Sequence, residues 1–92
     1  MLALDVKPKL APKTKLRFDE KSGKHVLLYP EKGLLLNPTG TAILKLCTGE
    51  HTLAAIIAQL SAEFQTDAEQ LQAEVHTFLQ GLLERGLIQA EP

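Results

Sequence analysis

The chain has 92 residues, which is enough for one compact domain with a small core and too few for two. Its single cysteine excludes an internal disulfide framework and fits a reducing compartment, and no apolar run approaches the length of a membrane span. Asp5 and Lys7 interrupt the opening apolar residues, so these do not form a secretory signal. The sequence therefore predicts a cytoplasmic protein that does not contact a membrane.

The net charge of −1 conceals a strong polarity along the chain. Residues 1–33 hold eight Lys/Arg and four Asp/Glu (+4), whereas residues 34–92 hold two and seven (−5). Opposed charges of this kind suggest that different faces meet different partners.

Three short strands are predicted in the first half of the chain. Residues 1–14, with prolines among lysines, show no sustained period and are expected to be a flexible arm. Residues 15–19 alternate polar and apolar, with Leu16 and Phe18 turned inward, and a polar turn leads to a second strand over residues 25–29. A tight turn at residues 30–33 then leads to residues 34–36, a run that suits a strand buried on both faces.

Three helices are predicted after these strands. The first has Asn37 as its N-cap and Pro38 at its first position, runs to about Cys47 and ends at Gly49. Gly40 in its first turn costs about 0.5–1 kcal/mol relative to alanine. The second helix begins near Thr52 and presents one apolar stripe, formed by Leu53, Ile56, Ile57, Leu60 and Phe64.

The third helix carries the fullest set of boundary signals. Thr66 and Glu69 match a capping box, Arg85 suits the C-terminal end, and Gly86 stops the helix. Its apolar residues cover an arc wider than one neighbouring helix needs: Leu71, Val75, Phe78, Leu79, Leu82 and Leu83. The order of elements predicts an α+β, winged-helix-like domain over residues 15–92, with an N-terminal three-stranded antiparallel sheet followed by a three-helix bundle.

No combination of residues indicates catalysis, a metal or a cofactor. His25, His51 and His76 are scattered over different elements, and Cys47 with His51 lacks the second pair of ligands that a metal site needs. No nucleophile motif or phosphate-binding glycine pattern is present in the sequence. We therefore predict a protein that is not an enzyme.

A winged helix is also compatible with nucleic-acid binding, which is the alternative function. The charges argue against it, because the second helix has no Lys or Arg and the third has only Arg85 beside several acids. We expect no nucleic-acid partner.

With catalysis and nucleic-acid binding disfavoured, the remaining function is recognition of a peptide. If residues 34–36 form an edge strand beside the third helix, an extended peptide can add to this edge and place side chains over the surplus apolar surface. The alternative is that this surplus only closes the core, and the pattern favours neither. The predicted binding residues are Gly33, Leu34, Leu35, Leu36, Asn37, Leu71, Val75, Phe78 and Leu79.

Residues 25–33, His-Val-Leu-Leu-Tyr-Pro-Glu-Lys-Gly, followed by Leu36-Asn37 and residues 43–49, resemble the PqqD family of pyrroloquinoline quinone (PQQ) biosynthesis. The likeness extends from residue 15 to residue 88. The resemblance implies a chaperone that binds the ribosomal precursor peptide PqqA and presents it to the radical SAM enzyme PqqE. It also implies that the peptide adds as a strand beside the third strand, over the third helix.

The association state is expected to be monomeric, with a strand-exchanged homodimer accessible at high concentration. The polar turn after residues 15–19 contains a glycine and could extend, so that the first strand pairs with a second copy.

Overall fold

The computed structural model describes residues 3–29 and 32–91. Met1 and Leu2, which belong to the opening segment discussed above, and Pro30 and Glu31 of the expected tight turn lie outside the described residues. The other half of that turn, Lys32 and Gly33, already belongs to a strand.

The first strand, β1 (Lys7–Leu10), was not predicted. It pairs antiparallel with β5 (Ile88–Glu91), with Lys7 opposite Glu91 and Leu10 opposite Ile88. The expectation of a flexible arm is therefore wrong for this segment, in which Pro8 is fully buried. A strand of four residues with a proline has no readable period, and its partners, β5 and residues 47–49, are distant in the sequence.

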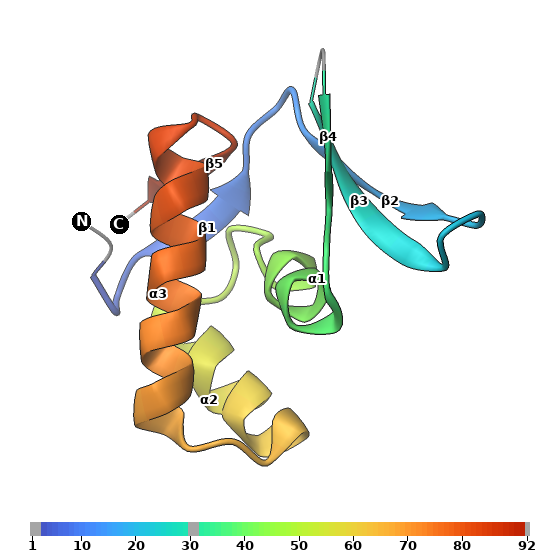
Figure 1. Ribbon diagram of the computed structural model, residues 1–92. Helices are drawn as coiled ribbons and strands as arrows, with labels where there is room; N and C mark the ends of the chain where they lie inside the picture. The colour runs from blue at the N-terminus through green and yellow to red at the C-terminus, as the bar shows by residue number, and fades with distance from the viewer. Residues whose placement is uncertain (1–2, 30–31, 92) are drawn as a thin grey trace.

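The predicted three-stranded meander is confirmed. Strands β2 (Lys15–Asp19), β3 (Lys24–Tyr29) and β4 (Lys32–Leu35) form an antiparallel sheet in the order β2-β3-β4. In Figure 1 this sheet lies above α1, and α3 runs along the opposite side of the molecule. The meander is thus held to the body through its inner face, which carries Leu27 and Leu36 into the core.

Helix α1 (Pro38–Lys45) follows β4 almost directly, because Asn37 caps it through a 2.7 Å bond from the Gly40 N–H to Asn37 Oδ1. The helix ends at Lys45, with Leu46 as its C-cap, about two residues before the predicted end at Cys47. Gly49 does not cap it but forms a turn with φ +85°, in which its N–H donates to the Pro8 carbonyl of β1.

Helix α2 (Leu53–Phe64) begins at Thr52 as predicted, with the Ala55 N–H donating to Thr52 Oγ1. Helix α3 (Ala68–Glu84) ends before Gly86, as predicted, but its predicted capping box is wrong. Asp67 occupies the N-cap position without a side-chain bond, and the Thr66 hydroxyl donates to the Phe64 carbonyl instead.

The hydrophobic core lies between the three helices, the inner face of the meander and β5. Three predicted inward or doubly buried residues are instead exposed: Phe18 (51%), Leu35 (54%) and Phe64 (38%). The strand over residues 34–36 is consequently buried on one face only. Periodicity identifies an apolar face, whereas its burial depends on whether another element covers it.

Candidate functional site

The outer edge of β4 has no strand beside it among the described residues, because β4 pairs only with β3. The Leu36 N–H donates to the His25 carbonyl at 2.9 Å, so residue 36 directs its backbone toward β3. In an antiparallel pair the direction alternates along the strand. Gly33 and Leu35 therefore direct their N–H and C=O groups to the open edge.

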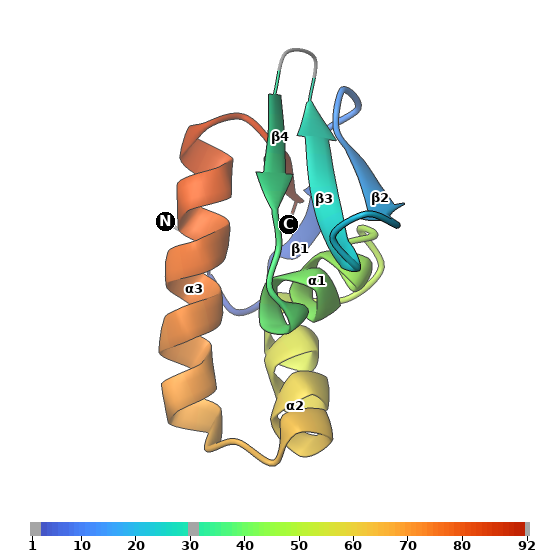
Figure 2. The same cartoon turned by 45° about the vertical axis from the view of Figure 1, so that its right-hand side comes forward.

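In Figure 1 and Figure 2, β4 is the strand of the meander nearest α3, so its open edge lies on the α3 side of the sheet, and the two elements run in opposite directions. Phe78 lies on α3 and is partly buried. A Cβ atom on Gly40 would stand 3.3 Å from Phe78 Cζ, so the ring packs closely on the first turn of α1. This contact explains the glycine inside a helical turn.

A cleft of about 340 Å³ continues the open edge between α1 and α3. It is lined by Asn37, Thr39, Gly40, Ile43, Glu74 and Phe78. The outward backbone groups of Gly33 and Leu35, the partly exposed Phe78 and this cleft lie on the α3 side of β4, and we call this surface the β4–α3 groove.

The predicted site residues fall into two groups. Gly33, Leu34, Leu35 and Asn37 of the edge region and Phe78 of α3 have at least part of their surface accessible. Leu36, Leu71, Val75 and Leu79 are buried in the core, so they support the β4–α3 groove from below. The surplus apolar arc of α3 is therefore used mostly to close the core, which was one of the two alternatives.

Sequence reasoning missed Thr39, Gly40, Ile43 and Glu74 as residues of the cleft. In the sequence, Glu74 looks like part of a solvated helix face. Its position beside α1 depends on how α1 and α3 pack, which the sequence pattern does not show. Gly40 offered a detectable signal, since a glycine inside a helical turn calls for a packing reason.

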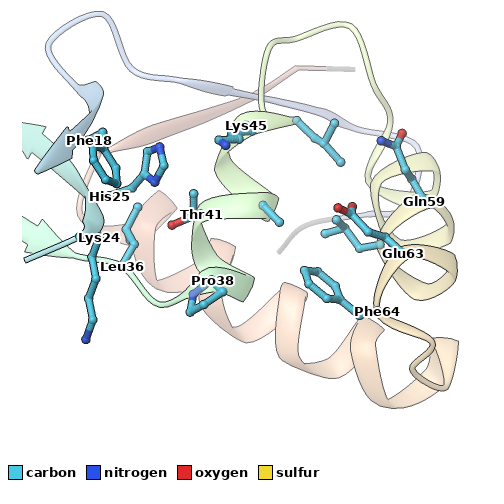
Figure 3. Close-up of a pocket in the computed structure, with 14 residues that line it drawn as sticks. Phe18, Lys24, His25, Leu36, Pro38, Thr41, Lys45, Gln59, Glu63 and Phe64 are labelled. Atoms are coloured by element: carbon cyan, nitrogen blue, oxygen red, sulfur yellow. The ribbon is translucent and has the colours of Figure 1, made fainter. Parts of the chain in front are cut away.

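A second groove, of about 520 Å³, lies on another face of α1 (Figure 3). Its apolar lining includes Leu36, Leu46 and Leu60, and the exposed rings of Phe18 and Phe64 flank it from the sheet and from α2. The Phe18 and His25 rings meet edge to face, with centroids 5.2 Å apart. No open strand edge of β4 borders this groove, so it does not offer the backbone groups of the first site.

Of the residues that the structure describes, Lys24, His25, Lys45 and Glu63 line the second groove, whereas Glu74 is the one titratable side chain that lines the cleft of the first. Among the described residues, no three His, Cys, Asp or Glu side chains lie close enough to hold a metal ion. Burial raises the pKa of the Cys47 thiol to about 12. Within residues 3–29 and 32–91, no helix is both long enough and apolar enough to cross a membrane.

An α+β domain with an open strand edge beside a helix flank has the geometry of a small domain that binds an extended chain. The family of coenzyme PQQ synthesis protein D (PqqD) matches residues 24–88, which are most of the chain, and the protein belongs to this family.

Relatives agree with this assignment. The chain is 35% identical to a PqqA binding protein of Methylococcus capsulatus, covering 86% of this chain and 83% of that protein. It is 40% identical to a PqqA binding protein of Kluyvera intermedia, covering 82% and 80%. It is also 34% identical to the bifunctional coenzyme PQQ synthesis protein C/D of Methylorubrum extorquens, covering 89% of this chain and 22% of that protein.

A solved structure shares the fold. The solution NMR structure of the PqqD truncation of Methylobacterium extorquens PqqCD, described as a functional, stand-alone recognition element for ribosomally synthesised and post-translationally modified peptides, superimposes with a TM-score of 0.82. The two chains are 33% identical, and the match covers 97% of this chain and 95% of that one.

Proposed function

We propose that this protein binds the precursor peptide PqqA in the β4–α3 groove and presents it to the radical SAM enzyme PqqE. The observation that carries the proposal is the open edge of β4, where Gly33 and Leu35 direct unpaired backbone groups to the α3 side of the sheet. The names of the PqqA binding proteins among its relatives support the choice of peptide.

The peptide would add to β4 as a fourth strand of the meander. Its backbone would exchange hydrogen bonds with Gly33 and Leu35, and its inward side chains would pack against Phe78. Backbone bonds give affinity without much sequence dependence, so the apolar contacts on α3 would supply the selectivity.

The role we propose is that of a cytoplasmic chaperone without catalytic activity. Its interaction surface offers backbone groups, apolar side chains and one carboxylate, that of Glu74, and within residues 3–29 and 32–91 no second titratable side chain lines the cleft to form an acid–base pair with it. The alternative, nucleic-acid binding, gains no support from the fold, because α2 carries no Lys or Arg and Glu74 lies in the cleft beside α3.

Titration of the labelled protein with PqqA, followed through amide chemical shifts, tests the proposal. We expect saturable shifts in β4, in the first turn of α1 and in α3. In Leu35→Pro, binding should fall at least tenfold while the fold persists, because the outward N–H is removed and the bond from Leu36 to His25 is retained.

Phe18→Pro is the matched control. By the same alternation, Phe18 directs its N–H to the open edge of β2, so this change removes an outward donor from the opposite side of the sheet. It should leave the affinity for PqqA within about twofold, given the distance between the two edges. Equal affinity in the wild type and in a folded Leu35→Pro variant would show that the peptide does not extend β4.

We also propose a monomer that reaches a strand-exchanged dimer only at high concentration. The open edge of β2 and the exposed turn around Gly23 support this exchange, which leaves the β4 edge free. Light scattering over a hundredfold range of concentration should show mass rising with concentration, whereas a dimer at every dilution would contradict the proposal.

A further inference from the structure

Gly81 lies near the middle of the second half of α3 and has no explanation within the protein itself. The other five of the six glycines each have one. Gly23, Gly49 and Gly86 adopt positive φ. Cβ atoms on Gly33 and Gly40 would stand 3.1 Å from Val26 and 3.3 Å from Phe78.

By contrast, a Cβ atom on Gly81 would meet nothing within 4 Å, and its φ is not positive. A glycine inside a helix destabilises it by about 1 kcal/mol relative to alanine. Alanine would therefore fit the free protein and stabilise it. The reason for a glycine at this position thus lies in a contact that the free protein does not make.

The position of Gly81 on α3 indicates which contact this is. Glu74 and Phe78 line the cleft, and Gly81 and Arg85 continue the same helical stripe at the next i+3 and i+7 positions after Phe78. Leu82, the next residue, is buried in the core. The stripe through Gly81 therefore borders the core on the side of the β4–α3 groove.

The height of Gly81 along the axis of α3 agrees with a position beside the β4–α3 groove. Phe78 packs beside Gly40 in the first turn of α1, and α3 runs in the opposite direction to β4 (Figure 2). Three residues later, Gly81 stands roughly 4.5 Å further along the axis, on the way from α1 toward β4. Gly81 therefore leaves an open space on the flank of α3 that carries Glu74 and Phe78, at a level closer to β4 than Phe78 is.

We propose that Gly81 is the position at which the bound peptide approaches α3 most closely, and that it receives one large apolar side chain of the peptide. This inference rests on the proposed function. Side chains of an added strand alternate between faces, and those on the face of Leu34 and Leu36 turn toward α3. The ligand class is therefore an extended segment with a leucine-, isoleucine- or phenylalanine-sized residue at that point.

The test uses Gly81→Ala and Gly81→Leu in the full chain, with PqqA titration and urea unfolding on the same samples. Gly81→Ala should raise the unfolding midpoint and weaken PqqA binding about threefold to tenfold, and Gly81→Leu should weaken it more than tenfold. Opposite signs for stability and affinity distinguish a ligand-contact role from a purely structural one.

Ala73→Leu is the control, because Ala73 is exposed on the solvent side of the same helix. It adds the same side chain outside the groove and should leave affinity unchanged. In addition, the large apolar residues of PqqA are truncated to alanine one at a time. One truncation should weaken binding to the wild type at least fivefold and have less than a twofold effect on Gly81→Leu, which identifies the side chain that Gly81 receives.

Wild-type affinity in both Gly81 variants, together with loss of binding in Leu35→Pro, would overturn this inference and leave the proposed function in place. Absence of saturable PqqA binding to the wild type would overturn both. Gly81→Ala keeps the experiment decisive if Gly81→Leu does not fold, because alanine favours the helix.

Discussion

Cys47 illustrates how burial controls the chemistry of one residue. Its thiol is buried behind α1 and donates to the Ile43 carbonyl at 3.3 Å. Desolvation disfavours the thiolate and raises the pKa from 9.0 to about 12. Because the thiolate is the reactive form, this cysteine is a core residue and not a nucleophile.

We predict that a thiol reagent at pH 8 modifies Cys47 only as fast as the protein unfolds.

The raised pKa also affects stability at alkaline pH. The unfolded chain loses the thiol proton near pH 9, whereas the folded chain keeps it until about pH 12. The stabilisation is therefore complete below pH 9 and declines as pH rises toward 12.

Urea unfolding at pH 8 and at pH 10.5 measures this decline. Cys47→Ala should lose less stability than the wild type between these two values, because only the wild type carries the thiol whose deprotonation favours the unfolded chain. An equal loss in both proteins would show that Cys47 contributes nothing to the alkaline response.

At the scale of the element, the helix N-caps show which capping signals in the sequence correspond to a hydrogen bond in the structure. Thr52 caps α2 by accepting from the Ala55 N–H at 3.1 Å, whereas Thr66, which has the sequence of a capping box, makes no such bond to α3. Thr52→Ala should lower the free energy of unfolding by about 1 kcal/mol. Thr66→Ala should lower it by clearly less.

Thermal unfolding of the two variants beside the wild type checks this prediction. A larger loss in Thr66→Ala than in Thr52→Ala would mean that the capping box forms in solution.

Caps and turns were foreseen where the interaction is local. Asn37 and Thr52 bond to residues three positions away, so their partners are visible in the sequence. The capping box predicted at Thr66 and Glu69 fails for a local reason as well. Ser61 Oγ donates to the Thr66 carbonyl at 2.5 Å, and the αL conformation of Gln65 moves the start of α3 by one residue. Competing local bonds are hard to rank from sequence.

At the scale of the whole molecule, the segment before residue 15 joins distant parts of the chain. The carbonyls of Leu4 and Val6 accept from the N–H groups of Ala54 and Leu53, at 2.9 and 2.8 Å, and so satisfy donors of the first turn of α2. The Ala11 N–H donates to the Leu87 carbonyl at 3.0 Å. This segment therefore connects α2 with β5.

We predict that replacing residues 3–10 by a glycine–serine linker of equal length lowers the free energy of unfolding by at least about 2 kcal/mol. Pro8 and the partly buried Val6 and Leu10 would leave the core surface, and the pairing with β5 would be lost. The urea midpoint gives the measurement. An unchanged midpoint would restore the idea of a flexible arm.

The sequence alone therefore predicted the three-stranded meander and the helices but not the closure of the fold. Alternation and turn residues define the meander locally, and β4 could be placed at an edge because consecutive short strands pair with their neighbours. β1 and β5 are separated by almost the whole chain, and neither is long enough to show a period. The exposure of Leu35 and the opening beside Phe78 depend on packing between elements, which local patterns do not contain.

The register of β1 and β5 also determines how the domain responds to mechanical force. Lys7 stands opposite Glu91, and both lie at the outer ends of the chain's strands. Tension applied to the two ends of the chain therefore first loads the bonds from Ala54 and Leu53 to Leu4 and Val6, and then the β1–β5 pairs one after another, toward Leu10 and Ile88. The two strands peel apart pair by pair at low force, whereas a parallel arrangement would bear the load on all pairs at once.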